Sequence, residues 1–219
     1  MNTLTVRGEL SRYAAAIAAN RLVVGPGGNI SAREGDMMYL SPSGYALQEI
    51  DPSQWVEVNI ATGRLEDNAL RPSSEVLLHL YVYRSNPDVG AIIHTHPPYC
   101  IALSLIGEEL PIMYPDQAAL VGRTSILPYV IPTTELLAEA CAASLATACS
   151  VILSHHGLVT TGRNLREAYY RTEVVEESSK IYLAARAAGN PTGLTEEEVT
   201  DIASLESEAY RIQLLQKMM

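Results

Sequence analysis

The chain has 219 residues, of which 47% are hydrophobic, and a formal net charge of −10. This length suits one domain with a sizeable core, and the acidic balance without a basic run argues against a nucleic-acid-binding surface. The three cysteines form no CxxC pair and no apolar run is long enough to cross a bilayer, so we expect a reduced cytoplasmic protein without membrane contact, its cysteines serving as small core residues.

The first half of the chain alternates helical and extended patterns. Leu10, Tyr13, Ala14 and Ile17 share one helical face, which predicts a helix over residues 7–20. The remaining expected elements are short strands at 29–33 and 37–45, a strand pair over 55–65 with a Thr62-Gly63 turn, and a helix from Pro72 to about Arg84.

The second half predicts buried strands and longer helices. A continuous apolar run indicates a buried strand at 89–96, and Asn164 with Glu167 indicates the capped start of a helix that reaches about Ala188. The segment 189–194 resembles a linker, which would free the last helix to lie on the body or on a neighbouring subunit. Between and after these we expect a helix at 99–107, an extended stretch at 124–132, a helix at 134–146, a strand-turn-strand unit at 150–162, and a final helix capped by Thr195 and Glu198 that carries Tyr210. The alternation predicts an α/β or α+β domain of three layers.

Two histidines stand one residue apart at the end of the predicted strand 89–96. Residues i and i+2 of a strand point to the same side, so His94 and His96 project together while Thr95 points away. They could bind one metal ion through ring nitrogens, or each could be a core histidine with its own hydrogen-bond partner. The HxH pattern alone does not decide between these alternatives.

A second pair, His155 and His156, precedes Gly157, which permits a sharp turn. The two side chains point opposite ways if the backbone is extended, so one can be a third ligand and the other structural. Three neutral imidazoles make a common catalytic zinc site with an open position. The fifth histidine, His79, lies on the helix after Pro72, where a packing or surface role is the more common one.

Glu75 is the best candidate for a carboxylate near such a site, although a glutamate in a first helical turn also complements the helix dipole. Ser73 and Ser74 stand beside it, where backbone N–H groups attract an anion. Two further turns rich in small residues, 27–29 and 41–44, could present N–H groups to a phosphate, or could simply be turns.

Taken in chain order, five motifs resemble the class II aldolase family typified by L-fuculose-1-phosphate aldolase and related to the adducin head domain. They are GGNIS (27–31), SPSG (41–44), PSSE (72–75), HTHPP (94–98) and SHHGLV (154–159). The match extends from the first helix to about residue 188. The resemblance implies a single α/β/α domain over residues 1–219, with a central, mostly antiparallel sheet and a helical tail at 195–219.

The resemblance also implies the site residues and the reaction, a zinc-dependent aldehyde-lyase cleavage of a ketose 1-phosphate into dihydroxyacetone phosphate and an aldehyde. About one zinc or other divalent ion per chain would be held by three histidines, and Glu75 would be the acid/base group and a further ligand. The implied metal ligands are His94, His96, His156 and Glu75, and the implied phosphate-binding residues are Gly28, Asn29, Ser43, Gly44, Ser73 and Ser74.

Tyr114 and Tyr210 match the two tyrosines that handle protons in this family, and the family's cyclic homotetramer would let them act on a neighbour's site. A 4-epimerase, decarboxylase or dehydratase acting on the same scaffold is an alternative. A non-catalytic adducin-like interaction domain is a second one, although such domains tend to lose the ligands that this chain keeps. The aldehyde product is not fixed by the sequence.

Overall fold

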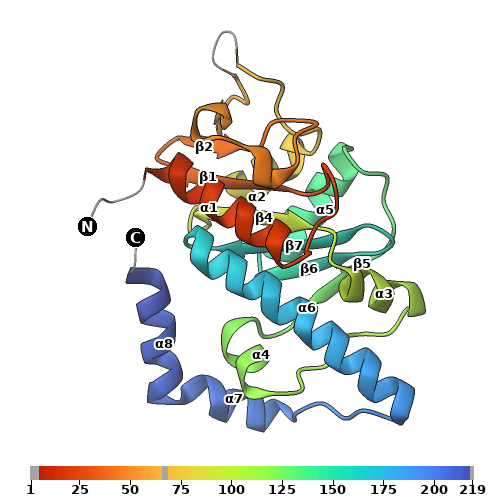
Figure 1. The fold of residues 1–219 in the computed structure, drawn as a ribbon. Coiled ribbons are helices and arrows are strands. Elements are labelled where there is room, and N and C mark those ends of the chain that lie inside the picture. Colours follow the sequence, from red (N-terminus) through yellow and green to blue (C-terminus); the bar gives the residue numbers. More distant parts are fainter. Residues whose placement is uncertain (1–4, 66–68, 218–219) are drawn as a thin grey trace.

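The computed structural model describes residues 5–65 and 69–217, and its centre is a seven-stranded sheet in the order β3-β2-β1-β4-β7-β6-β5 (Figure 1). Neighbouring strands are antiparallel except for the β5–β6 pair. The strands are β1 (Asn29–Glu34), β2 (Met37–Leu40), β3 (Val56–Asn59), β4 (Ala91–Thr95), β5 (Ser125–Leu127), β6 (Ser150–Leu153) and β7 (Gly157–Gly162). The prediction of a mostly antiparallel sheet is confirmed.

Helices cover both faces of the sheet and make three layers (Figure 1). The helices α2 and α5 pack on one face, whereas α1, α3 and α6 pack on the other. The helices are α1 (Val6–Ala19), α2 (Val76–Ser85), α3 (Pro98–Ile106), α4 (Pro115–Leu120), α5 (Glu135–Leu145), α6 (Leu165–Ala188), α7 (Glu196–Ser204) and α8 (Glu206–Lys217), with short 3₁₀ turns η1 (Leu47–Glu49) and η2 (Pro52–Gln54).

Strand alternation decides which side chains meet the helices on each face. On β4, Ile92 packs with the α2 and α5 cluster and Ile93 with the α1 and α6 cluster. His94 lies two residues after Ile92 on the same strand, so its side chain points to the same face and toward α2. On β1, Ile30 faces α1, so its neighbour Asn29, which is paired with His94 in the sheet, also faces α2. The register thus directs polar groups from two central strands toward one end of α2.

Three details differ from the expected elements. The second strand of the predicted 55–65 pair is reduced to a single bridge between Val58 and Leu65. The short helix α4 was not predicted, because six residues are too few to show a helical period. The last helix is two helices, since Leu205 adopts an extended backbone that ends α7 before α8 begins. The Asn164 and Thr195 caps are present as expected.

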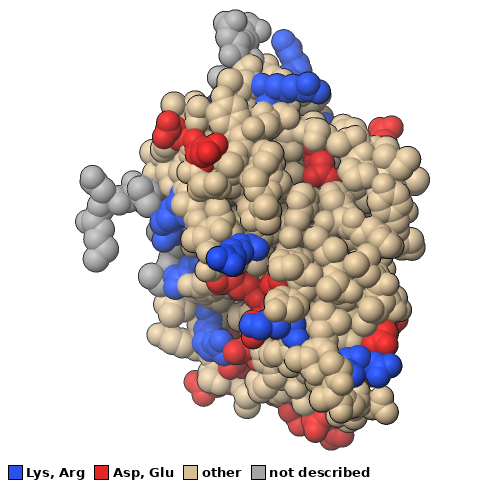
Figure 2. Space-filling model, turned by 45° about the vertical axis from the view of Figure 1, so that its right-hand side comes forward, with Lys and Arg blue, Asp and Glu red and all other residues tan. Residues whose placement is uncertain are grey.

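The cysteine prediction is confirmed in that all three are free and Cys100 and Cys141 are buried. Figure 2 shows a face made largely of uncharged residues, on which Lys or Arg lies beside Asp or Glu in the lower half. Several large apolar side chains of α3 and of the segment after β5 are exposed: Tyr99, Leu105, Ile106, Tyr129 and Ile131. Among the described residues, none of the helices combines the length and the apolar character needed to span a membrane.

Candidate active site

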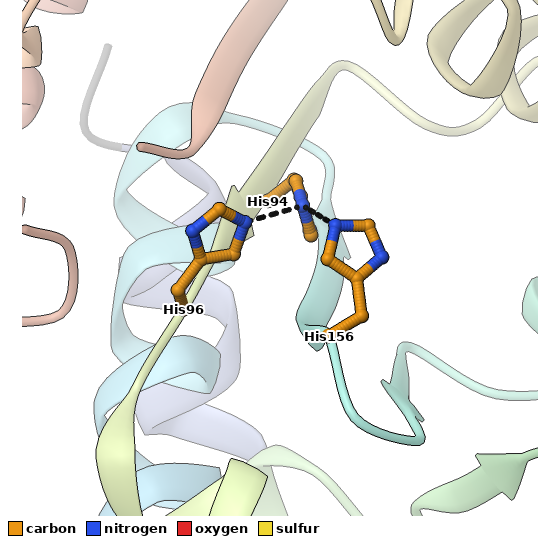
Figure 3. A group of neighbouring side chains, drawn as sticks. All are labelled: His94, His96 and His156. Carbon is orange, nitrogen blue, oxygen red and sulfur yellow. Dashed lines mark hydrogen bonds between the residues drawn. The ribbon is translucent and has the colours of Figure 1, made fainter. Parts of the chain in front are cut away.

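Three imidazole rings from two distant segments point at one common position (Figure 3). His94 lies on β4, His96 directly follows that strand, and His156 lies in the turn between β6 and β7. The Nε2 atom of His94 is 3.1 Å from Nε2 of His96 and 3.3 Å from Nε2 of His156. The structure therefore brings together the three histidines that the sequence singled out, as a group that could hold a metal ion.

The hydrogen bonding of His94 fixes which of its nitrogens is free. Its Nδ1 is 3.0 Å from the carbonyl oxygen of Leu158, which can only accept, so Nδ1 carries the proton. In the neutral ring, Nε2 then presents a lone pair to the common position. A ring held in this way by a backbone carbonyl is the usual arrangement for a metal-binding histidine.

Glu75 faces the same position from the start of α2. Its Oε2 atom lies 3.1 Å from Nε2 of His94, and its Oε1 atom lies 3.5 Å from Nε2 of His156. The side chain of Asn29 donates a hydrogen bond of 2.8 Å to Oε2, whereas Oε1 is buried and lacks a hydrogen-bond partner among the described residues. The carboxylate is thus anchored through one oxygen and leaves the other available.

The electrostatics of the four groups favour a cation. Burial lowers the pKa of His96 and of His156 to about 4, and the neighbouring His94 acts in the same direction, so both rings are neutral at pH 7. Burial raises the pKa of Glu75, but His94, His156 and the hydrogen bond from Asn29 outweigh it and hold the pKa well below its usual value. Burial lowers the pKa of His94, yet attraction to Glu75 leaves it raised overall.

This donor set fits a zinc-like ion. A tetrahedral ion with zinc–nitrogen bonds of about 2.05 Å separates two ligand nitrogens by about 3.3 Å, close to the separations of His94 Nε2 from the other two rings. Lone pairs and a carboxylate at such short range repel one another unless a positive charge lies between them. The unpartnered Oε1 of Glu75 fits the same interpretation.

The backbone around the third histidine differs from the expectation. His155, with φ of +59°, takes the left-handed conformation in this turn, which was expected of Gly157. Gly157 is required for another reason, because a Cβ atom there would overlap the carbonyl oxygen of Thr95 and approach the ring of His96. His155 is exposed and contacts the edge of Tyr129, so it lies outside the histidine group, as predicted.

The loops expected to bind phosphate lie side by side. Ser41 binds the N–H of Ile30 through its hydroxyl oxygen, and its carbonyl oxygen accepts the N–H of Ser73. A bridge between Pro42 and Pro72 joins the two turns directly. The loop of Gly28 precedes β1 and therefore adjoins them. These contacts place all three loops beside the histidine group.

Not every predicted phosphate ligand is free to bind an anion. The N–H of Ser43 donates to Arg71 and that of Ser73 to Ser41, so their hydroxyl groups are the donors that remain. The side chain of Asn29 is bonded to Glu75 rather than directed to a phosphate. Gly28 and Gly44 have φ of +73° and +85°, which suits glycine, and Ser74 is exposed.

Among the described residues, neither predicted tyrosine has a hydrogen bond to the histidine group or to Glu75. The hydroxyl group of Tyr114 bonds with Ser178 and donates to the carbonyl oxygen of Val174 on α6, while burial raises its pKa. Tyr210 is 65% exposed on α8. The carbonyl oxygen of Leu215 in that helix accepts a hydrogen bond from the side chain of Asn164. Asn164 lies just past the last residue of β7, at the end of the strand remote from His156.

His79 is a buried packing residue, one of the two alternatives expected from the sequence, and it also has hydrogen bonds that were not expected. It is fully buried, and its Nε2 is 2.6 Å from Oδ1 of Asn29, which in turn holds Glu75. The available signal was the spacing of four between Glu75 and His79, which places both on one side of a helix.

Comparison with known proteins agrees with this geometry. The family model described as Class II Aldolase and Adducin N-terminal domain matches residues 8–183. The chain is 32% identical over 199 residues to 5-deoxy-D-ribulose 1-phosphate aldolase of Bacillus thuringiensis serovar kurstaki, covering 90% of this chain and 93% of the relative. It is 36% identical over 164 residues to L-fuculose phosphate aldolase of Methanococcus vannielii, covering 74% and 86%.

A solved structure of L-fuculose 1-phosphate aldolase superposes with a TM-score of 0.86 at 31% identity, covering 96% of this chain and 98% of that one. The residues matched by the family model include the three histidines and Glu75. The family model spans most of the chain, and the three histidines lie together in the structure. The chain therefore belongs to the class II aldolase and adducin family.

Proposed function

We propose that this protein is a zinc-dependent aldolase that cleaves a ketose 1-phosphate reversibly into dihydroxyacetone phosphate and an aldehyde. The observation that carries the proposal is the convergence of His94, His96, His156 and Glu75 on one position. The names of the aldolases to which the chain is similar support the reaction class.

Each group has a chemical task in this proposal. The three histidines would hold a divalent ion, which would supply Lewis-acid stabilisation of the negative charge that develops on a substrate oxygen. The serine turns beside the site hold the phosphate and orient the sugar. Cleavage of the C3–C4 bond leaves its electron pair in a three-carbon enediolate. The Glu75 carboxylate takes up the proton of the C3 hydroxyl group and delivers it to the C3 carbon through its free Oε1, while the proton that leaves the C4 hydroxyl group returns to the C3 oxygen.

The proton on the aldehyde side needs a second group. We assign it to Tyr114 or Tyr210 from a neighbouring copy, since within one chain neither hydroxyl group has a histidine of the site or Glu75 as a hydrogen-bond partner in the described ranges. Exposed apolar side chains on α3, including Leu105 and Ile106, support an interface between copies of this chain, which we propose to be a homotetramer. Light scattering of the purified protein measures its mass directly.

The reaction is tested with a panel that contains L-fuculose 1-phosphate and 5-deoxy-D-ribulose 1-phosphate. Dihydroxyacetone phosphate is measured by coupled reduction with NADH, and the aldehyde is trapped as a hydrazone. We expect both products in equal amounts, loss of activity on treatment with a chelator, and recovery with zinc. Conversion to an epimer or release of carbon dioxide, without dihydroxyacetone phosphate, would instead identify one of the alternative reactions.

A further inference from the structure

A chain of buried hydrogen bonds leads from Glu75 into the core between α2 and β1. Asn29 Nδ2 is 2.8 Å from Glu75 Oε2, and Asn29 Oδ1 is 2.6 Å from Nε2 of His79. On the other side of the ring, His79 Nδ1 is 2.7 Å from the hydroxyl oxygen of Ser31, which is 2.9 Å from that of Tyr83. All five side chains are at most 7% exposed.

The bond between Asn29 and Glu75 fixes the direction of every other bond in this chain. Oε2 of the carboxylate accepts from Nδ2 of the Asn29 amide. The oxygen of that amide therefore faces His79, whose Nε2 must carry a proton in order to donate to it. A neutral ring with a proton on Nε2 has a lone pair on Nδ1, so Ser31 donates to Nδ1 and Tyr83 donates to Ser31.

The opposite direction is unfavourable. A proton on Nδ1 of His79 would leave a lone pair on Nε2, and the Asn29 amide would have to turn its nitrogen toward it. The amide oxygen would then lie against a carboxylate oxygen of Glu75, and two acceptors would be in contact at the 2.8 Å separation. Burial lowers the pKa of His79 to about 3, so the ring is neutral and cannot donate from both nitrogens.

We propose that His79 is a positioning residue for the reaction, which acts by holding the Asn29 amide in the one orientation that presents an N–H to Oε2 of Glu75. This inference rests on the proposed function for its kinetic consequence. Anchoring Oε2 leaves Oε1 as the oxygen that exchanges a proton with substrate. His79 does not touch substrate itself, because Asn29 lies between it and the carboxylate.

Three substitutions separate positioning from packing. In His79→Gln the side-chain nitrogen reaches the place of Nε2 and can still donate to Asn29. In His79→Asn the side chain is too short for that bond. In Tyr83→Phe the last bond of the same chain is lost, while Ser31 can still donate to His79. The melting temperature of each variant is measured to confirm folding and to compare the loss of stability.

We expect His79→Asn to lower kcat for ketose 1-phosphate cleavage by about tenfold to a hundredfold, with KM changed by less than about threefold. His79→Gln should recover most of the loss. Tyr83→Phe should keep kcat within about twofold of the wild type, although it also loses a buried hydrogen bond and some stability. Normal kcat in His79→Asn, equal loss in Tyr83→Phe, or no recovery in His79→Gln each overturns the proposal.

A second measurement does not depend on activity. In wild-type protein labelled with ¹⁵N-histidine and loaded with zinc, the signals of His79 are identified by their absence from His79→Gln. We expect the proton on Nε2 and none on Nδ1, and the opposite tautomer overturns the inference. If the wild type cleaves no ketose 1-phosphate, the proposed function fails, while this spectrum still decides the role of His79.

Discussion

The Nδ1 atom of His94 on β4 donates a hydrogen bond of 3.0 Å to the carbonyl oxygen of Leu158 on the adjacent strand β7. The bond joins the two segments that carry the histidine group, since His156 lies two residues before Leu158. It also selects the tautomer in which Nε2 of His94 has a lone pair for the shared position. The pairing of these two strands thus orients the Nε2 atom of His94 toward the shared position.

Replacement of His156 by alanine should remove both the metal and the activity. The ring supplies one of three converging nitrogens, so we expect zinc affinity to fall by more than about a hundredfold, beyond the loss seen when only a ligand's supporting residue is removed. Competition with a chelator measures the affinity, and elemental analysis measures the bound zinc. Aldol cleavage should fall below detection in the same preparation.

The neighbouring His155 provides a matched control. It is exposed, lies outside the group, and has a left-handed backbone that asparagine also tolerates. We expect His155→Asn to keep zinc affinity and kcat within about twofold of the wild type. If His156→Ala retained full activity, or His155→Asn lost its metal, the assignment of ligands would be wrong.

Replacement of Glu75 by glutamine tests its role in proton transfer. The variant keeps the shape of the side chain but cannot take up and return a proton, so we expect kcat to fall by about 10² to 10⁴. Zinc content should stay near that of the wild type, because the three histidine nitrogens remain. A variant that cleaved substrate at the normal rate with full zinc would exclude Glu75 as the acid/base group.

The histidine group could be predicted because short local patterns encode it. Alternation on a strand gives His94 and His96 a common side, and the glycine after His156 marks a turn at the end of another strand. What joined these patterns was the order of five motifs along the chain, which resembles a known family. The three-layer fold followed from the same alternation of strands and helices.

The support of the site could not be predicted in the same way. His79 depends on a contact with Asn29 that joins residues 50 positions apart. The spacing of four between Glu75 and His79 places both on one side of a helix but does not predict that contact. The need for Gly157 comes from the close approach of the Thr95 carbonyl group on another strand, not from its own backbone angle. Tyr210 lies on a helix whose position depends on Asn164 and other distant contacts.

Substitution of Gly157 by alanine should therefore damage the site through its packing. The added Cβ atom would overlap backbone of β4, which cannot move like the end of a flexible side chain. We expect a loss of about 1 to 3 kcal/mol in the free energy of unfolding by urea and weaker zinc binding. Gly189→Ala is the control, because nothing lies within 4 Å of its added Cβ atom. Equal stability of the two variants would contradict the close approach.

The buried His79 should make stability depend on pH in a defined window. Burial lowers its pKa to about 3 in the folded protein, whereas in the unfolded chain it titrates near 6.5. The unfolded state therefore binds more protons below about pH 6.5, and stability is lost as the pH falls from there toward 3.

Glu75 and His94 also act on the ring, so we compare the wild type with His79→Gln under identical metal conditions. Between pH 7.5 and 5.0, the free energy of unfolding of the wild type should fall by about 2 kcal/mol more than that of the variant. Parallel curves in urea titrations would show that His79 is protonated in the folded state, and the neutral ring required by its hydrogen bonds would then be excluded.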